Sequence, residues 1–116
     1  MDRGAIGRIC LALPAVTLDH PFGDHHDAYR VGGKMFVMVG QDGGVSFKVS
    51  AIAYEVLTET GRARPAPYLA RAKWVNLPDT EAAEGWTDAD MADHLASAHA
   101  IVAAKLAKKV RADLGL

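Results

Sequence analysis

Apolar and polar residues follow two different periods along this chain, one typical of strands and one typical of helices. Residues 45–49 alternate cleanly, which predicts a strand with its valines and phenylalanine in the core and with Ser46 and Lys48 facing water. Two further apolar runs, residues 29–31 and 35–39, flank a pair of glycines, and such a pair favours a two-residue hairpin turn. The three runs together predict an antiparallel meander.

The helical period appears first in two short segments. Residues 4–13 predict a first helix that ends before Pro14, because the residue preceding a proline avoids helical torsions. Ser50 can cap a second helix, and Gly61 is a natural stop just past its end. Both helices are predicted to be short and to present one apolar face.

The strongest helical signal lies near the C-terminus. Apolar residues recur from Met91 to Leu106 at spacings of three and four, and Thr87 with Asp90 resembles a capping box. This pattern predicts one helix over residues 88–112, about 38 Å long at 1.5 Å per residue.

Between the second and the last predicted helix, the chain is rich in proline and positive charge. Residues 62–73 hold two prolines, four cations and no acid, so this stretch is not expected to begin as a helix. Residues 74–77 then predict a short strand at or near a sheet edge, because the proline that follows cannot donate to a ladder. The elements indicate one α+β domain over residues 1–116.

Net charge hides a strong segregation of charge. The 13 Lys and Arg nearly balance 14 Asp and Glu, for a net charge of −1, which argues against a protein that is basic all over. However, residues 62–73 and 105–111 each carry +4, whereas residues 79–93 carry −6 and residues 19–27 carry −3. Such a chain can present a basic face to an acidic partner, although charge runs are also common on solvated faces.

Composition excludes several classes of protein. Half of the residues are apolar and 23% are charged, which excludes a disordered chain, a collagen-like repeat and a disulfide scaffold. Cys10 is the single cysteine, so an internal disulfide is excluded, and its place in a helical stripe predicts a buried, inert thiol. No apolar run approaches the ~20 residues of a membrane span, and the start lacks a leader pattern. We therefore expect a cytoplasmic protein.

Candidate catalytic and metal-binding motifs are weak. The glycine pairs fit hairpin turns rather than a phosphate loop, and the sequence lacks a nucleophile elbow and paired carboxylates at an element end. The loop 19–27 holds three histidines and three aspartates, but without a defined ligand spacing it favours a solvated, pH-sensitive loop over a metal site. On the long helix, Asp90 and His94 can pair, and His99 is expected to pack partly buried with one nitrogen satisfied. The sequence thus predicts a protein without enzymatic activity, metal or cofactor.

Five short motifs occur in a characteristic order. They are HPFG at 20–23, YRVGGKMF at 29–36, VSFK at 45–48, RPAPYL at 64–69 and VAAKL at 102–106. With Trp74 between the last two, they resemble the MmcQ/YjbR family from about residue 13 to residue 109. The resemblance implies a frataxin-like (CyaY-like) α+β fold, in which terminal helices cover one face of an antiparallel sheet made of the meander and a further strand. It also implies DNA binding by a double-wing arrangement, in which strands approach the duplex.

Charge and resemblance together predict a small, monomeric DNA-binding protein. Cations of the hairpin turn and the basic segment would contact phosphates, an exposed ring would stack on bases, and the C-terminal cations would assist. The predicted contact residues are Lys34, Arg62, Arg64, Tyr68, Arg71 and Lys73. If about five phosphates are neutralised, the logarithm of the affinity should fall with log salt at a slope of roughly −4 to −5, with little sequence specificity.

The alternative is a protein-interaction or regulatory domain without nucleic-acid binding. In that hypothesis a partner or a small ligand binds between sheet and loop, residues 64–69 form a rigid wall, and the cations are incidental. Under either hypothesis, Tyr68 and Trp74 can anchor the loop to the core instead of stacking on bases, and for Trp74, at the head of a strand, core packing is the favoured interpretation. Whether the predicted cations share one face distinguishes the two hypotheses.

Overall fold

A computed structural model describes residues 1–80, 83 and 85–116. Within these residues, six strands form one antiparallel sheet in the order β1-β2-β3-β4-β6-β5. The strands are β1 (Val16–Asp19), β2 (Asp27–Val31), β3 (Lys34–Val39), β4 (Val45–Lys48), β5 (Arg64–Pro65) and β6 (Trp74–Leu77). The helices are α1 (Arg3–Leu11), α2 (Ala51–Glu59), the 3₁₀ turn η1 (Ala70–Ala72), α3 (Asp88–Ala104) and α4 (Lys108–Asp113).

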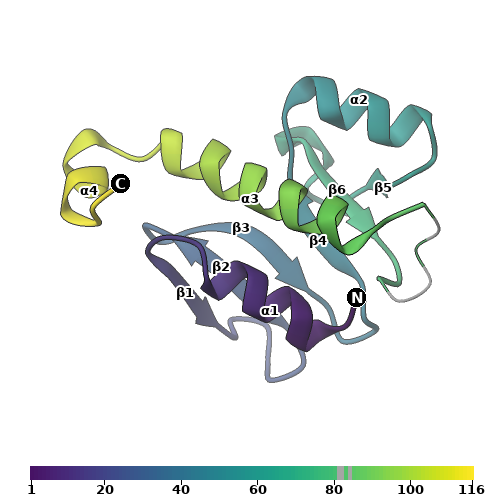
Figure 1. Ribbon diagram of the computed structural model, residues 1–116, viewed down its shortest axis with the longest axis horizontal. Coiled ribbons are helices and arrows are strands. Elements are labelled where there is room, and N and C mark those ends of the chain that lie inside the picture. The colour runs from purple at the N-terminus through teal and green to yellow at the C-terminus, as the bar shows by residue number, and fades with distance from the viewer. Residues whose placement is uncertain (81–82, 84) are drawn as a thin grey trace.

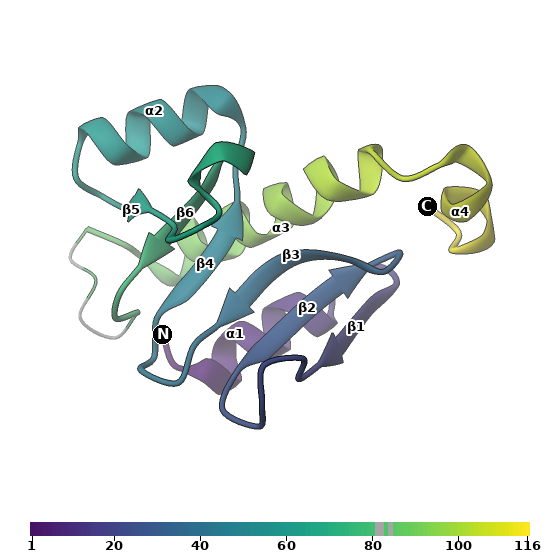
Figure 2. The same ribbon diagram turned by 180° about the vertical axis from the view of Figure 1, so that it is seen from behind.

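Helices α1 and α3 pack against the same face of the sheet, as the resemblance predicts. They contact each other, and α3 runs across β2, β3 and β4 (Figure 1). From the other side, the sheet stands in front of both helices, and α2 lies beyond β5 and β6 (Figure 2). We call the side of the sheet that is turned away from α1 and α3 the outer face.

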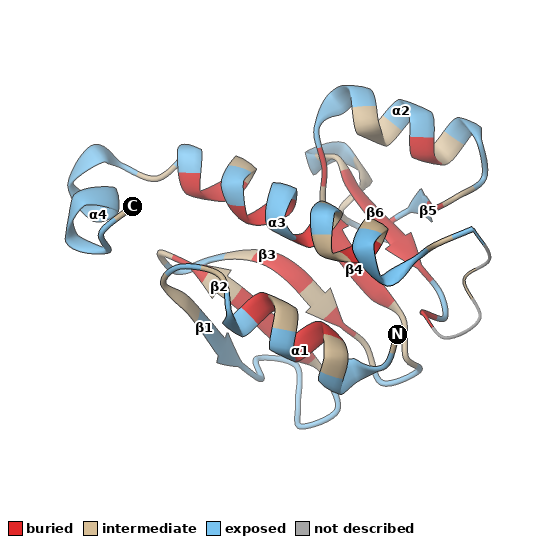
Figure 3. Cartoon of the chain, viewed as in Figure 1, coloured by how far each residue is buried: buried red, intermediate tan, exposed pale blue. Residues whose placement is uncertain are grey.

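The hydrophobic core lies between this helical layer and the sheet. Ile6 of α1 and Leu95 of α3 are fully buried against the ring of Tyr29 and of two phenylalanines from β3 and β4 (Figure 3). The capping box of α3 is formed as predicted: Thr87 Oγ1 accepts from the Asp90 backbone, and the Asp90 carboxylate accepts from Thr87 N. Burial of apolar area on one side of the sheet therefore holds α1 and α3 in place against it.

The meander and its first turn also form as predicted. Gly32 and Gly33 have φ of 57° and 79°, the pair of positive values that a type I′ hairpin turn requires. Gly32 has a second reason to lack a side chain, because a Cβ there would lie 2.6 Å from Leu106 Cδ1. One β-bulge interrupts the β2–β3 ladder, where Tyr29 pairs with Val37 and Arg30 with Met35.

Several sequence predictions were wrong in detail. The long helix ends at Ala104, and a separate α4 follows an extended backbone at Ala107. Leu106, predicted to continue the apolar stripe, instead packs onto the hairpin glycine. Strands β1 and β5 were not predicted, and β5 makes β6 the second strand from the edge. Ser46, expected in water, is buried on the outer face, where it meets Asn76.

A buried carboxylate fastens α1 to the sheet. Asp27 begins β2 and accepts hydrogen bonds from Nε and Nη2 of Arg3 and from His20 Nε2, the last at 3.0 Å. The Asp27 side chain is 7% exposed. The Arg3 guanidinium is the main cause that holds the pKa of Asp27 below its usual range, and His20 adds to it.

This ion pair predicts an acid-sensitive contribution to stability. Because the pKa of Asp27 is lower in the folded chain than in the unfolded chain, the stabilisation is complete above about pH 5, begins to fall near the unfolded-chain value of about 3.9, and is lost as pH falls through the lower pKa of the folded chain. Asp27→Asn should lower the free energy of unfolding at pH 7 by about 1.5–3 kcal/mol, typical of hydrogen bonds to a charged group. Urea titrations at pH 7 and pH 3 measure the difference, and an equal loss at both pH values would contradict the assignment.

Candidate functional site

Cationic side chains from several segments converge at the end of the sheet where β3 begins and β4 ends. They surround a hollow of about 490 Å³, which we call the cationic pocket. Its lining residues are Lys34, Met35, Lys48, Arg71, Ala72, Lys73, Trp74, Val102 and Lys105. None of these described lining residues is acidic, so the pocket suits an anion.

Local backbone geometry brings the cations together. Lys34 directly follows the glycine turn, and Lys48 ends β4, with its Nζ donating to the carbonyl of Ala72. Lys73 has a left-handed backbone with φ 61°, which ends η1 and starts β6. Its ammonium lies 4.8 Å from the centre of the Tyr54 ring of α2. Lys105 joins from the C-terminal end of α3.

The charges of the cationic pocket influence one another. Burial lowers the pKa of Lys48 from its ordinary value, and the positive charges of Lys105 and Lys73 lower it further. Repulsion among like charges that have no acidic neighbour in the pocket is relieved when an anion binds. A bound phosphate would therefore stabilise the charged lysines of this cluster more than water does.

A hollow with a different lining adjoins the cationic pocket on the outer face. We call it the apolar groove; it encloses about 490 Å³. The lining residues are Phe22, His26, Met35, Met38, Pro67, Tyr68 and Leu69. Met35 lines both hollows, so the groove and the cationic pocket adjoin at this side chain.

The bulge in β3 builds the floor of the apolar groove. Phe36 is the residue without a partner in the β2–β3 register, and its ring is buried against His99 of α3, with ring centres 5.3 Å apart. With this extra residue turned inward, both Met35 and Met38 line the outer side of β3. Methionine is flexible and polarizable, so this floor can adapt to a flat ligand.

Tyr68 stands on the wall of the apolar groove in a strained turn. Leu69 N donates to Ala66 O at 3.1 Å, which closes a β-turn with Pro67 in the second position and Tyr68 in the third. The φ of Tyr68 is 66°, the value that type II turns require at this position and usually meet with glycine. A non-glycine residue there costs about 1–3 kcal/mol. The Tyr68 side chain is fully exposed, so packing does not explain the tyrosine.

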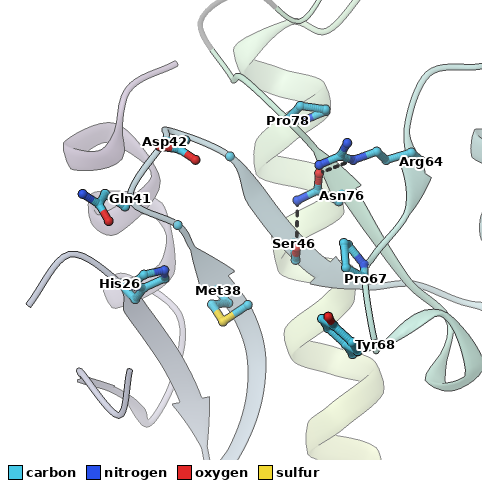
Figure 4. A pocket seen from close by; sticks show the side chains of 12 residues that line it. His26, Met38, Gln41, Asp42, Ser46, Arg64, Pro67, Tyr68, Asn76 and Pro78 are labelled. Carbon is cyan, nitrogen blue, oxygen red and sulfur yellow. Dashed lines mark hydrogen bonds between the residues drawn. The ribbon is translucent and has the colours of Figure 1, made fainter. Parts of the chain in front are cut away.

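A polar hollow of about 360 Å³ continues the groove toward the other end of the sheet (Figure 4). Arg64 Nε donates to Asn76 Oδ1 at 2.8 Å, and Asn76 Nδ2 donates to Ser46 Oγ at 2.9 Å. Met38 and Tyr68 line this hollow as well as the apolar groove. The outer face thus offers polar, apolar and cationic surfaces in succession.

The structure brings together only part of the predicted contact set. Lys34, Arg71 and Lys73 line the cationic pocket, Tyr68 lines the groove beside it, and Arg64 lines the polar hollow. Arg62 lies elsewhere: its Nη2 donates to Gly85 O at 3.1 Å and reaches Asp90 at 3.4 Å, and its guanidinium covers the Trp86 ring. Trp74 is 6% exposed, in agreement with a packing role.

Sequence reasoning missed Lys48 as a site residue and gave Lys105 only an auxiliary role. Strand alternation predicts that Lys48 faces water. The same alternation places Lys48 on the outer face, so it is the signal that could have identified this residue. Lys105 belongs to the C-terminal basic segment, but the end of α3 at Ala104 turns it toward the pocket.

The histidine and acid loop is engaged in structural contacts. His20 bonds to Asp27, and Asp19 pairs with Arg30 across β1 and β2 at 3.1 Å. In the part of the chain that the structure describes, no three potential ligands converge on a metal position. Glu81 and Glu84, two acids of the −6 segment, lie outside the described residues.

Cys10, His99 and His94 pack within the fold. Cys10 is fully buried, which raises the pKa of its thiol to about 12 and agrees with an inert thiol. His99 Nε2 donates to Pro14 O at 2.8 Å, in agreement with the prediction of one satisfied nitrogen. His94 lies against the rings of Phe47 and Trp86, and burial lowers its pKa; Asp90, its expected partner, binds Arg62 and Thr87 instead. Among the described helices, none is long and apolar enough to cross a membrane.

Comparisons with known proteins identify the family and agree with the fold. The family model described as YjbR matches residues 11–101. The chain belongs to the YjbR family. Its fold is similar to the crystal structure of Deinococcus radiodurans protein DR2400, of the domain family DUF419, with a TM-score of 0.79 and 22% identity over 94% of this chain and 84% of that one. A search of curated proteins found no match.

The charge cluster predicts a measurable coupling between two lysines. Lys105→Met should raise the pKa of Lys48 toward its ordinary value, because it removes one of the charges that disfavour a second ammonium, while the effect of burial remains. An NMR titration of the lysine side chains measures this shift. Lys109→Met on α4 is the matched control and should leave Lys48 unchanged; an unchanged Lys48 in both variants would show that the cluster is not coupled.

Proposed function

We propose that this YjbR-family protein binds DNA, with weak sequence preference, through the cationic pocket and the apolar groove beside it. The observation that carries the proposal is the convergence of cations from separate segments on one hollow without an acidic lining residue among those described. DNA presents closely spaced phosphates, and lysine and arginine side chains bind them as charges. In this proposal the protein acts as a cytoplasmic monomer.

The proposed phosphate contacts differ from the set expected from sequence. Lys34, Arg71 and Lys73 remain, and Lys48 and Lys105 join them. Arg62 is left out because its guanidinium already has an acidic partner and an aromatic one. Arg64 lies at the margin of the proposed site, in the polar hollow. Its Nε donates to Asn76, and its other guanidinium nitrogens could bind a phosphate.

The proposal includes no catalytic step and no cofactor. Cys10, His94 and His99, three groups that could act as nucleophile or base, are packed in the helical layer away from the outer face, whereas His26 lines the apolar groove. Contacts of lysine to phosphate position a strand without reading its bases, which is why we expect weak sequence preference.

A second candidate is a protein-interaction domain that receives apolar side chains of a partner. The specific observation in its favour is the apolar groove, with Phe22 61% exposed and Tyr68 fully exposed on its walls. The cationic pocket would then have no role, and its neutralisation should leave partner binding unchanged.

The DNA proposal predicts a salt-dependent affinity that depends on the cationic pocket. Fluorescence anisotropy of a labelled oligonucleotide, tested both as a duplex and as a single strand, should detect binding at micromolar protein in low salt. Lys73→Gln should weaken that binding by about tenfold and make the dependence of log affinity on log salt shallower by about 1, because one phosphate contact is lost.

Arg8→Gln is the matched control, since it removes the same charge from α1 on the opposite side of the sheet. It should leave both affinity and salt slope unchanged. Equal losses in the two variants would indicate attraction to net charge alone, and absence of binding to either form of DNA would refute the proposed function.

A further inference from the structure

The apolar groove has the chemistry to hold unpaired bases. We infer that the preferred ligand of this site is single-stranded DNA, with bases in the apolar groove and the adjoining phosphates in the cationic pocket. The inference rests on the proposed function, because it specifies the form of DNA that the same site takes.

The lining of the groove cannot read a duplex. In double-stranded DNA the faces of the bases are covered by stacking, and a protein reaches only phosphates and the polar base edges. Reading those edges relies mainly on hydrogen-bonding side chains, whereas the groove is lined mostly by methionine, proline, leucine and two aromatic rings, with the Tyr68 hydroxyl and His26 as its polar groups. Such a surface is complementary to the face of a base, and base faces are accessible only in an unpaired strand.

The arrangement of the rings supports the same ligand. Phe22 comes from the connection between β1 and β2, and Tyr68 from the connection between β5 and β6, so the two rings belong to opposite sides of the methionine floor. The turn that carries Tyr68 is fixed at both ends, since Ala66 N donates to Trp74 O at 3.0 Å and Trp74 N donates to Leu69 O at 3.2 Å. The backbone that carries the ring is therefore held in place before a base stacks on it.

Tyr68 is also the residue whose identity folding does not require. Its left-handed φ favours glycine, its ring is fully exposed, and its neighbours in the turn supply the hydrogen bonds. A ring retained at a strained position is explained by a ligand that uses it.

Charge complementarity indicates where the sugar–phosphate backbone of the bound strand would lie. Met35 forms part of the groove floor and of the cationic pocket, so a base that stacks on Met35 would have its phosphate near the lysines of that pocket. Alternating stacking surface and cation along one groove is the arrangement by which proteins hold single strands.

The test compares three ligands that share phosphates and differ in their bases. Each is an oligonucleotide of about 12 nucleotides, within the usual site size: a single strand of mixed sequence, the corresponding duplex, and an abasic strand of the same length. We expect the single strand to bind at least tenfold more tightly than the duplex or the abasic strand, because stacking contributes severalfold to a hundredfold per base.

Variants assign the preference to the groove. Tyr68→Gly should weaken binding of the single strand by about tenfold and leave the abasic strand unchanged, while its thermal midpoint is no lower than that of the wild type. Ile52→Ala, which removes an exposed apolar side chain from α2, should change neither affinity. Lys73→Gln should weaken binding of all three ligands.

The outcomes separate the two proposals. Duplex binding as tight as single-strand binding would overturn the inference and leave the proposed function intact. Preference for the single strand that survives Tyr68→Gly would also overturn it, since the bases would then lie elsewhere. Failure of all three ligands to bind would refute the proposed function itself, and the inference with it.

Discussion

The packing of α1 and α3 against one face of the sheet decides what the other face can do. Because most of the apolar residues of β2, β3 and β4 pack against this helical layer, the outer face carries the remaining side chains, including Met35, Met38 and Ser46. The loop between β5 and β6 covers part of that face with a braced turn. What stays open is the succession of polar hollow, apolar groove and cationic pocket, so the candidate site is a consequence of one-sided packing.

Sequence reasoning recovered those parts of the fold whose signal is local. The glycine pair required a hairpin, alternation identified β4, and Thr87 with Asp90 marked the start of α3. It failed where tertiary contacts decide. Strand β1 is only four residues long and mostly exposed, and β5 spans only two residues, one of them a proline. No glycine or proline marks the end of α3 in the sequence. The helix ends instead through a tertiary contact, in which Leu106 packs over Gly32.

The same limit applies to the candidate site. The basic segment was evident from composition, yet composition could not show that Arg62 turns to Asp90 and Trp86 while Arg71 and Lys73 turn the other way. The contribution of Lys105 requires α3 to cross the sheet and end beside the β2–β3 hairpin. The β3 bulge, which brings Met35 and Met38 onto one surface, leaves no mark in the sequence at all. Residue types were therefore predictable, whereas their grouping was a property of the fold.

Charge segregation gives the near-zero net charge a physical meaning. A protein of net charge −1 exerts little long-range attraction on DNA, and at physiological salt the field of a local cluster is screened within about 8 Å. The cationic pocket therefore acts only on a strand that already lies in contact with it. Contact is favoured where the ligand also stacks on the adjoining apolar surface. Stacking depends less on salt than attraction to phosphates does. For the DNA binding that we propose, near neutrality would thus weaken indiscriminate attraction to duplex DNA and leave the combination of groove and pocket to select the ligand.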